Sequence, residues 1–176
     1  GPLSIWSDQS GRNHDFFQTD PSARPSVVGA QIGSYPIIRF AAENFLVGPD
    51  LMNGATAGEI ISVVRRSTII PDAFQTLFGF GTGFGTGYYN SDTYEDFGSD
   101  ISYFHAATPL ADQYHIRSVS SAGGSLSERI NGIETWKQAG ITAAFRTVPG
   151  IGGGFIGDVA EVLVYDRALS DPEREA

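Results

Sequence analysis

The sequence predicts an all-β fold, a sandwich of two antiparallel sheets. Short apolar runs separated by Gly, Pro, Asn and Asp recur along all 176 residues, which is typical of a β-sandwich. The 22 glycines and the 12% share of aromatic residues favour strands and turns over helices. No linker or low-complexity tail interrupts the pattern, so residues 1–176 are expected to form one domain.

Nine apolar runs are expected to be strands. They are Pro36–Phe40, Phe45–Val47, Glu59–Arg66, Thr76–Phe80, Ile101–His105, Tyr114–Ser120, Leu126–Ile130, Ile133–Lys137 and Gly157–Tyr165. The Asn131-Gly132 dipeptide predicts a type I′ hairpin, because both residues tolerate a positive φ. One helix is expected near the end of the chain, with Ser170 as N-cap, Pro172 in the first turn and Glu173 completing a capping box.

Charge and composition restrict the classes of partner. A formal net charge of −9 argues against nucleic acid, because phosphate binding needs a basic surface. No apolar run is long enough to insert into a membrane as a spanning helix. The absence of cysteine excludes disulfides and thiolate zinc sites. A neutral glycan, a cationic partner and a metal ion remain open.

Several segments share features with a known family. "SIWSDQSGRNHDF" carries Trp6, Asp8, Ser10 and Gly11 in a Trp-x-Asp-x-Ser-Gly pattern, "RPSVVGAQIGSYPIIRF" is a proline-led strand ending in Arg-Phe, and "RINGIE" is an Asn-Gly hairpin. The most specific segment is "FIGDVAEVLVYDRALSDPERE". Together they resemble the concanavalin A-like lectin/glucanase superfamily, and within it the laminin G-like domains of bacterial proteins. The resemblance implies a jelly-roll sandwich and glycan binding outside the cell.

The segment "LFGFGTGFGTGYYNSDTYEDFGSD" has glycine at every odd position from Gly79 to Gly87. It contains no G-x-G-x-x-G frame and no Gly-Lys-Ser/Thr, so a nucleotide-binding loop is not expected. The alternation predicts a strand with one face free of side chains. Either a neighbouring strand or a ligand could approach that bare face. The phenylalanines expected to pack inward are Phe78, Phe80 and Phe84.

The second half of this segment is expected to leave the sheet as a rim loop beside a glycan site. Tyrosine rings can stack on sugars, and amide and carboxylate groups accept hydrogen bonds from sugar hydroxyls. A solvated acidic loop is the structural alternative, and core packing is the alternative for Trp136. The candidate ligand-binding residues are Tyr88, Tyr89, Asn90, Asp92, Tyr94, Asp96 and Trp136.

The acidic residues of the same segment are also candidates for calcium, which prefers oxygen ligands. Asp92 and Asp96 are the expected metal ligands, and Asp8 and Asp158 are further candidates. Family members often hold calcium, so the resemblance supports the expectation. For each aspartate the structural alternative is a side chain that caps a turn.

No catalytic constellation is evident. Asp158 and Glu161 are three residues apart in one strand and are therefore expected on opposite faces. Glu59 stands alone in the sequence, the histidines lack metal-ligand spacing, and the two arginines that end "VVRR" are expected to be solvated strand-end charges.

These observations favour a monomeric, non-catalytic carbohydrate-binding or adhesion module. The opening "GPLS" has the form of a remnant left by removal of an expression tag, and the module is expected to come from a larger extracellular bacterial protein. Two alternatives stay open. One is a glycoside hydrolase or polysaccharide lyase of the same fold, and the other is a structural or protein-interaction domain of a surface or virion protein.

Overall fold

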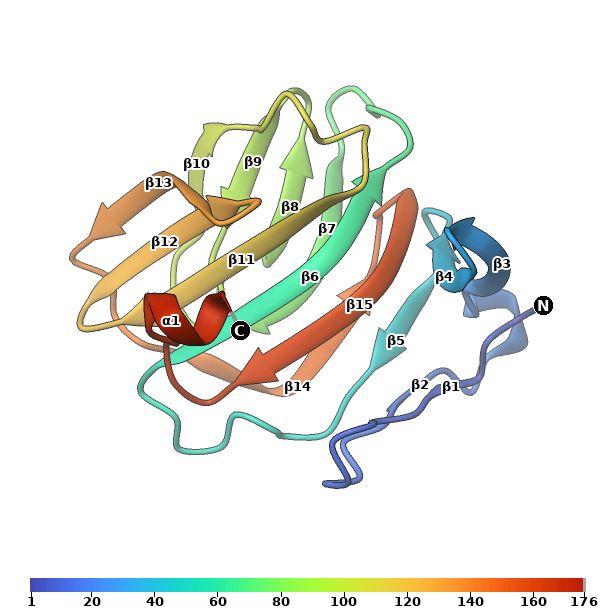
Figure 1. Ribbon diagram of the computed structural model, residues 1–176, viewed down its shortest axis with the longest axis horizontal. Helices are drawn as coiled ribbons and strands as arrows, with labels where there is room; N and C mark the ends of the chain where they lie inside the picture. Colours follow the sequence, from blue (N-terminus) through green and yellow to red (C-terminus); the bar gives the residue numbers. More distant parts are fainter. Residues whose placement is uncertain (176) are drawn as a thin grey trace.

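The computed structural model describes residues 1–175 and consists of two antiparallel sheets packed face to face (Figure 1). The predicted two-sheet antiparallel sandwich is confirmed, and its architecture is consistent with a jelly roll. In Figure 1 the seven-stranded sheet lies in front and the eight-stranded sheet behind it. Among residues 1–175, no helix is long and apolar enough to cross a membrane.

The seven-stranded sheet has the order β13 (Ile133–Ala139), β12 (Ser125–Ile130), β11 (His115–Ala122), β6 (Gly58–Arg66), β15 (Gly157–Tyr165), β4 (Tyr35–Phe40) and β3 (Ser26–Ile32). The eight-stranded sheet has the order β1 (Ile5–Trp6), β2 (Phe16–Phe17), β5 (Phe45–Val47), β14 (Phe145–Gly152), β7 (Phe74–Gly81), β8 (Thr86–Tyr89), β9 (Asp92–Glu95) and β10 (Tyr103–Ala106). A 3-10 turn (Pro21–Ala23) and one helix, α1 (Asp171–Arg174), complete the fold.

All nine predicted strands are present, with ends that differ by a few residues at most. The hairpin is confirmed: Ile130 pairs with Ile133, and φ is 50° at Asn131 and 83° at Gly132. The capping box is confirmed as well, with Ser170 and Glu173 bonded reciprocally at the start of α1. These elements were predictable because a few local residues determine each of them.

The hydrophobic core lies between the two sheets and is rich in aromatic rings. Its most buried members include Phe40, Phe78, Phe80, Phe97 and Phe155, each at most 1% exposed. Alternation along the strands sends one set of side chains into this layer and the other set to the outer faces of the sandwich. Trp6 is half-buried and packs against the edge of the core.

The Trp-x-Asp-x-Ser-Gly segment forms a loop that is organised by one carboxylate. Asp8 accepts hydrogen bonds from the backbone N–H groups of Ser10 (2.8 Å), Arg12 (3.2 Å) and His14 (3.1 Å), and from the Ser10 hydroxyl (2.7 Å). These hydrogen bonds, led by the Ser10 N–H, lower the pKa of Asp8 to about 2. The structural alternative for this aspartate, a turn cap, therefore describes what Asp8 does in the fold.

Candidate functional site

Four of the five alternating glycines have a structural reason within the chain. A Cβ at Gly81, Gly83 or Gly87 would lie 1.8, 2.5 or 2.1 Å from atoms of Asp96 or Gln75, and Gly85 has a φ of +103°. At Gly87 the missing side chain makes room for the ring of Tyr94, whose hydroxyl would lie 2.8 Å from that Cβ. The bare face is thus largely used by neighbouring parts of the same chain.

Gly79 is different, because no contact with residues 1–175 requires glycine there. A Cβ at Gly79 would meet no atom closer than 3.9 Å, and its φ is not positive. Its partner across the β7–β14 ladder is Gly150, where a Cβ would meet only an ordinary contact at 3.4 Å. Glycine inside a strand is destabilising by about 0.5–1 kcal/mol relative to alanine. Two adjacent glycines without a structural role therefore point to another molecule approaching the backbone.

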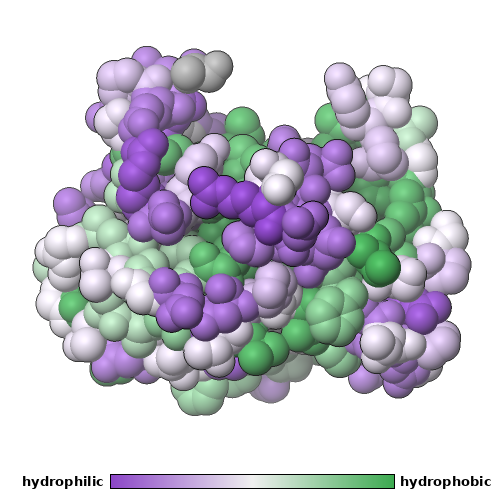
Figure 2. Space-filling view, turned by 90° about the horizontal axis from the view of Figure 1, so that it is seen from below, coloured by the Kyte–Doolittle hydropathy of each residue, from purple (hydrophilic) through white to green (hydrophobic). Residues whose placement is uncertain are grey.

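The two glycines form the floor of an open groove of about 330 Å³ on the outer face of the eight-stranded sheet. Residues of β5, β7 and β14 line it, and we call it the glycine groove. Its walls are exposed apolar side chains, namely Phe45 (40% exposed), Phe84 (70%) and Val148 (61%). In Figure 2 the eight-stranded sheet lies along the lower part of the view, where hydrophobic residues reach the surface.

An aromatic platform continues from the groove across the same face. It consists of Phe74, Phe84, Tyr89 and Phe104. Phe74 lies at the centre, with ring centroids 5.5 Å from Phe84, 4.8 Å from Tyr89 and 6.2 Å from Phe104. Phe74 and Phe104 remain 42% and 50% exposed. The platform and the groove share Phe84, so they form one continuous surface from β5 to β10.

A few polar groups border this surface. The Thr76 hydroxyl lines the glycine groove and lies 2.8 Å from the Tyr94 hydroxyl. The Arg146 guanidinium donates to the carbonyls of Gly81 and Gly83, which holds the β7–β8 connection in place. Flat apolar faces with a small number of polar groups at their edge are the usual composition of a small-molecule site.

The tyrosine-rich segment is not a rim loop, so that expectation is corrected. It forms the hairpin of β8 and β9 within the eight-stranded sheet, and Asn90 lies in the turn with a φ of 52°. Tyr88 is only 1% exposed and points into the core, where it contacts Phe155 and lies beneath the guanidinium of Arg66. Tyr94 is 0% exposed because Phe74 and Phe104 cover its ring. Tyr89, a member of the platform, and Asp92, its partner across the hairpin, stay accessible.

Phe84 was also assigned to the wrong environment. The sequence pattern predicted that it packs inward, but β7 ends at Gly81 and Phe84 lies in the connection to β8, where it is exposed. Phe78 and Phe80 do pack in the core as predicted.

The two expected metal ligands do not share one place. Asp92 begins β9 and Asp96 follows its end, four residues further on, which corresponds to about 13 Å of extended strand. Asp96 is buried, and its Oδ2 accepts from Gly85 N–H (2.8 Å) and the Ser102 hydroxyl (3.2 Å). Within residues 1–175, no group of three or more Asp, Glu or His side chains is arranged to hold a metal ion. Calcium binding itself stays a prediction.

Trp136 closes the edge between the two sheets. Its ring stacks on His105 of β10, with centroids 4.3 Å apart and planes inclined by 11°, and it lies 6.3 Å from Tyr103. Trp136 is half-buried and packs against the core, so most of its face is occupied by the chain itself.

Behind this edge lies a buried ionic cluster that sequence reasoning missed. Arg117 donates 2.8 Å hydrogen bonds to Glu95 and Glu128, and all three side chains are at most 3% exposed. Burial raises the pKa of Glu95 to about 7, because the attraction of Arg117 is shared with Glu128 and does not compensate for lost hydration. Burial also raises the pKa of Glu128, but Arg117 and His105 outweigh that effect and keep it below the usual value. Both glutamates are buried inside the sandwich, and neither lines the glycine groove.

Asp158 and Glu161 lie on the same outer face, contrary to the prediction. A bulge between Val159 and Glu161 adds one residue to β15, so Asp158 pairs with Arg65 and Glu161 with Val63, two residues earlier in β6. Asp158 is fully buried and accepts hydrogen bonds from Arg39 (2.7 Å), Arg65 (3.1 Å) and the Tyr114 hydroxyl (2.7 Å).

The two arginines that end "VVRR", Arg65 and Arg66, are not solvated strand-end charges, contrary to the prediction. Arg65 is ion-paired, and Arg66 is buried and donates to the Asn90 carbonyl.

No protein-family model matches the chain, and no curated protein sequence matches it. Solved structures do match. They include the Trypanosoma rangeli sialidase in complex with sialic acid (TM-score 0.69, 14% identity, 99% of this chain and 31% of that one). Another is the receptor-binding domain of botulinum neurotoxin mosaic serotype C/D (0.68, 7%, 98% and 49%). A third is domain 4 of AbnA, a GH43 extracellular arabinanase from Geobacillus stearothermophilus, in complex with arabinotriose (0.62, 15%, 85% and 78%).

At these identities the likeness concerns the fold alone, and the chain spans about a third of the sialidase and half of the toxin domain. The chain is therefore a β-sandwich that shares its architecture with these proteins.

Proposed function

We propose that this chain is a non-catalytic carbohydrate-binding module, extracellular and part of a larger protein, that holds a neutral glycan on the outer face of its eight-stranded sheet. The observation that carries the proposal is the Gly79–Gly150 pair, which keeps a groove open without a structural need. The complex of one similar structure with arabinotriose, a neutral oligosaccharide, supports a glycan as ligand.

The chemistry of the surface agrees with a sugar ligand. A pyranose ring has an apolar face that can stack on Phe84 or on the other platform rings, and hydroxyls that can reach Thr76, Tyr89 and Arg146 at the edge. Tyr89, Asn90 and Asp92 stay in the proposal as ligand contacts at the far end of the platform. Tyr88, Tyr94 and Asp96 act from within, because they support the strands that carry the surface.

The absence of a usable acid pair on this surface favours binding over catalysis. Retaining glycoside hydrolysis needs two carboxyl groups about 5 Å apart at one sugar, and no residue lining the glycine groove is acidic. A calcium ion is a separate part of the proposal and rests on the family resemblance alone.

A broad array of neutral oligosaccharides tests the proposal directly. Wild-type protein should bind at least one glycan class, and Phe84→Ala should weaken that binding several-fold, a loss on the order of 1 kcal/mol. Phe84 is exposed, so its removal should leave the melting temperature unchanged. Absence of binding to every glycan would favour a protein-interaction domain, and release of reducing or unsaturated ends would favour a hydrolase or lyase.

A further inference from the structure

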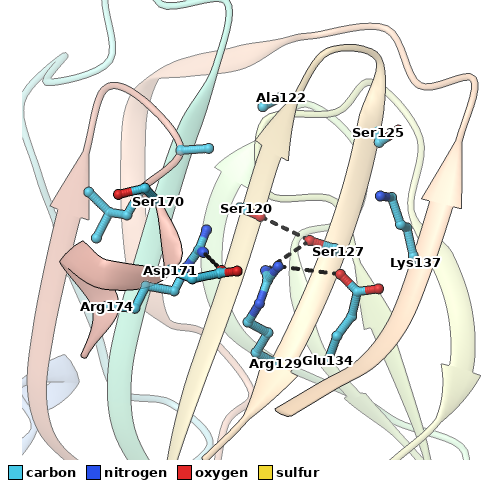
Figure 3. A pocket seen from close by; sticks show the side chains of 12 residues that line it. Ser120, Ala122, Ser125, Ser127, Arg129, Glu134, Lys137, Ser170, Asp171 and Arg174 are labelled. Atoms are coloured by element: carbon cyan, nitrogen blue, oxygen red, sulfur yellow. Dashed lines mark hydrogen bonds and ion pairs between the residues drawn. The ribbon is translucent and has the colours of Figure 1, made fainter. Parts of the chain in front are cut away.

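A second groove of about 350 Å³ lies on the outer face of the seven-stranded sheet (Figure 3). Its floor is made by four small residues of β11 and β12: Ser120, Ala122, Ser125 and Ser127. We call it the serine groove; it is on the opposite face of the sandwich from the glycine groove.

One wall of the serine groove is α1, which is fixed in place by a buried carboxylate. Glu59 of β6 is 0% exposed and accepts from Arg174 Nε (2.7 Å) and Nη2 (2.8 Å), from the Leu169 N–H (2.8 Å) and from the Ser118 hydroxyl (2.6 Å). A helix of a single turn does not hold its own position in water. This anchoring therefore gives the groove a fixed wall.

The opposite wall carries two cations that are loosely held. Lys137 is the only lysine of the chain, and within residues 1–175 it forms no ion pair, although the sequence has 20 acidic residues. Arg129 lies 3.4 Å from Glu134 and 3.3 Å from the Ser127 hydroxyl, both long contacts for a guanidinium. In Figure 3 the two side chains lie on either side of the Glu134 carboxylate, beside Ser127 and Ser125.

We propose that the serine groove is a subsite for a single carboxylate, such as that of a uronic acid, bound by Lys137 and Arg129 above the hydroxyls of Ser125 and Ser127. Ammonium and guanidinium groups both make strong hydrogen bonds to carboxylates. Glu134, which is paired with Arg129, and Asp171 also line the groove, so its net positive charge is too small for a densely charged polyanion and suits a single carboxylate that competes with Glu134. This subsite is independent of the glycan proposal for the other face.

The single lysine allows a direct test. Reductive methylation with ¹³C-formaldehyde keeps the positive charge and labels one side chain, whose NMR signal is distinct from that of the terminal amine. At low ionic strength, titration with glucuronate should shift the Lys137 signal saturably, while glucose at equal concentration should not. Acetate should shift it more weakly if the sugar ring contributes and equally if only the carboxylate is recognised. No saturable shift with glucuronate, or an equal shift with glucose, would overturn the proposal.

Substitutions provide the second measurement, by calorimetric titration of the unlabelled protein with glucuronate. Arg129→Gln should weaken binding about tenfold, the low end for a hydrogen bond to a charged group. Glu134→Gln should strengthen it, because it removes a negative neighbour and releases Arg129. Arg12→Gln, an exposed arginine in the loop of Asp8, is the matched control and should change nothing. Weaker binding by Glu134→Gln, or equal loss with Arg12→Gln, would contradict the assignment.

Discussion

The anchoring of α1 by Glu59 leads to a quantitative prediction for Arg174→Met. The substitution keeps a good helix former at this position but leaves Glu59 buried without its cation. Removing one partner of a buried ion pair costs about 3–5 kcal/mol. Arg174 is 13% exposed and Glu59 keeps the Ser118 hydroxyl and the Leu169 N–H as donors, so we expect the free energy of unfolding to fall by about 2–3 kcal/mol.

For a chain of this length each kcal/mol corresponds to about 2–4 °C, so the melting temperature should drop by about 4–12 °C at neutral pH. The loss should depend on pH. Burial alone would raise the pKa of Glu59, but the hydrogen bonds from Arg174, Ser118 and Leu169 hold it below its ordinary value of 4.5. The pair therefore stabilises the wild type above that pH, and the stabilisation is lost as pH falls through the folded-state pKa.

Urea unfolding of wild type and Arg174→Met at pH 7 and at pH 3.5 is the assay. The difference between the two proteins should be large at pH 7 and much smaller at pH 3.5, where Glu59 becomes protonated in the variant. Arg167→Met is the control, because it removes the exposed Arg167–Glu173 pair from the same segment and should leave the melting temperature unchanged. A difference below about 0.5 kcal/mol at pH 7, within the range of ordinary surface substitutions, would refute the reasoning.

Three further predictions concern the interior and the metal. Burial raises the folded-state pKa of Glu95 to about 7, so the native state binds the carboxyl proton of Glu95 more tightly than the unfolded chain does. The contribution of Glu95 to stability therefore falls as pH rises from 4.5 to 7. Glu95→Gln should remove this pH dependence of the free energy of unfolding, measured with urea. Trp136→Ala should lower the melting temperature by several degrees through loss of the stack on His105, and unchanged glycan affinity in this variant would remove Trp136 from the ligand-binding residues. If calcium is bound, excess EDTA should lower the melting temperature and added calcium restore it, whereas an insensitive melting temperature would remove calcium from the account.

Local signals were sufficient to predict much of the fold. The Asn131-Gly132 hairpin, the capping box at Ser170 and the boundaries of β15 depend on residues that are close in sequence. The strands β8, β9 and β14 were missed because their sequences, "TGYY", "DTYE" and "FRTVPGIG", contain the glycine, acidic and proline residues that usually indicate turns. Their pairing with neighbours distant in sequence makes them strands.

The candidate site was predictable only in part for the same reason. The unusual glycine pattern identified the right segment, and one of its glycines, Gly79, has the open face that the pattern suggested. Its partner Gly150 is 71 positions away, and only the β7–β14 ladder shows that the two are adjacent. Which tyrosines face outward depends on register, since each strand sends successive residues to opposite faces. Tyr88 and Tyr89 therefore received the same role from the sequence but have opposite orientations in the fold.

The measurement that tests the central claim most directly compares Gly79→Val with Gly29→Val. Both glycines lie in strands with open space and ordinary φ, but only Gly79 is on the floor of the glycine groove. Valine should fill the groove at position 79 while stabilising the strand. We predict that Gly79→Val has an unchanged or higher melting temperature and loses binding to the glycan identified on the array, while Gly29→Val binds as wild type does. Wild-type affinity in Gly79→Val would contradict the account.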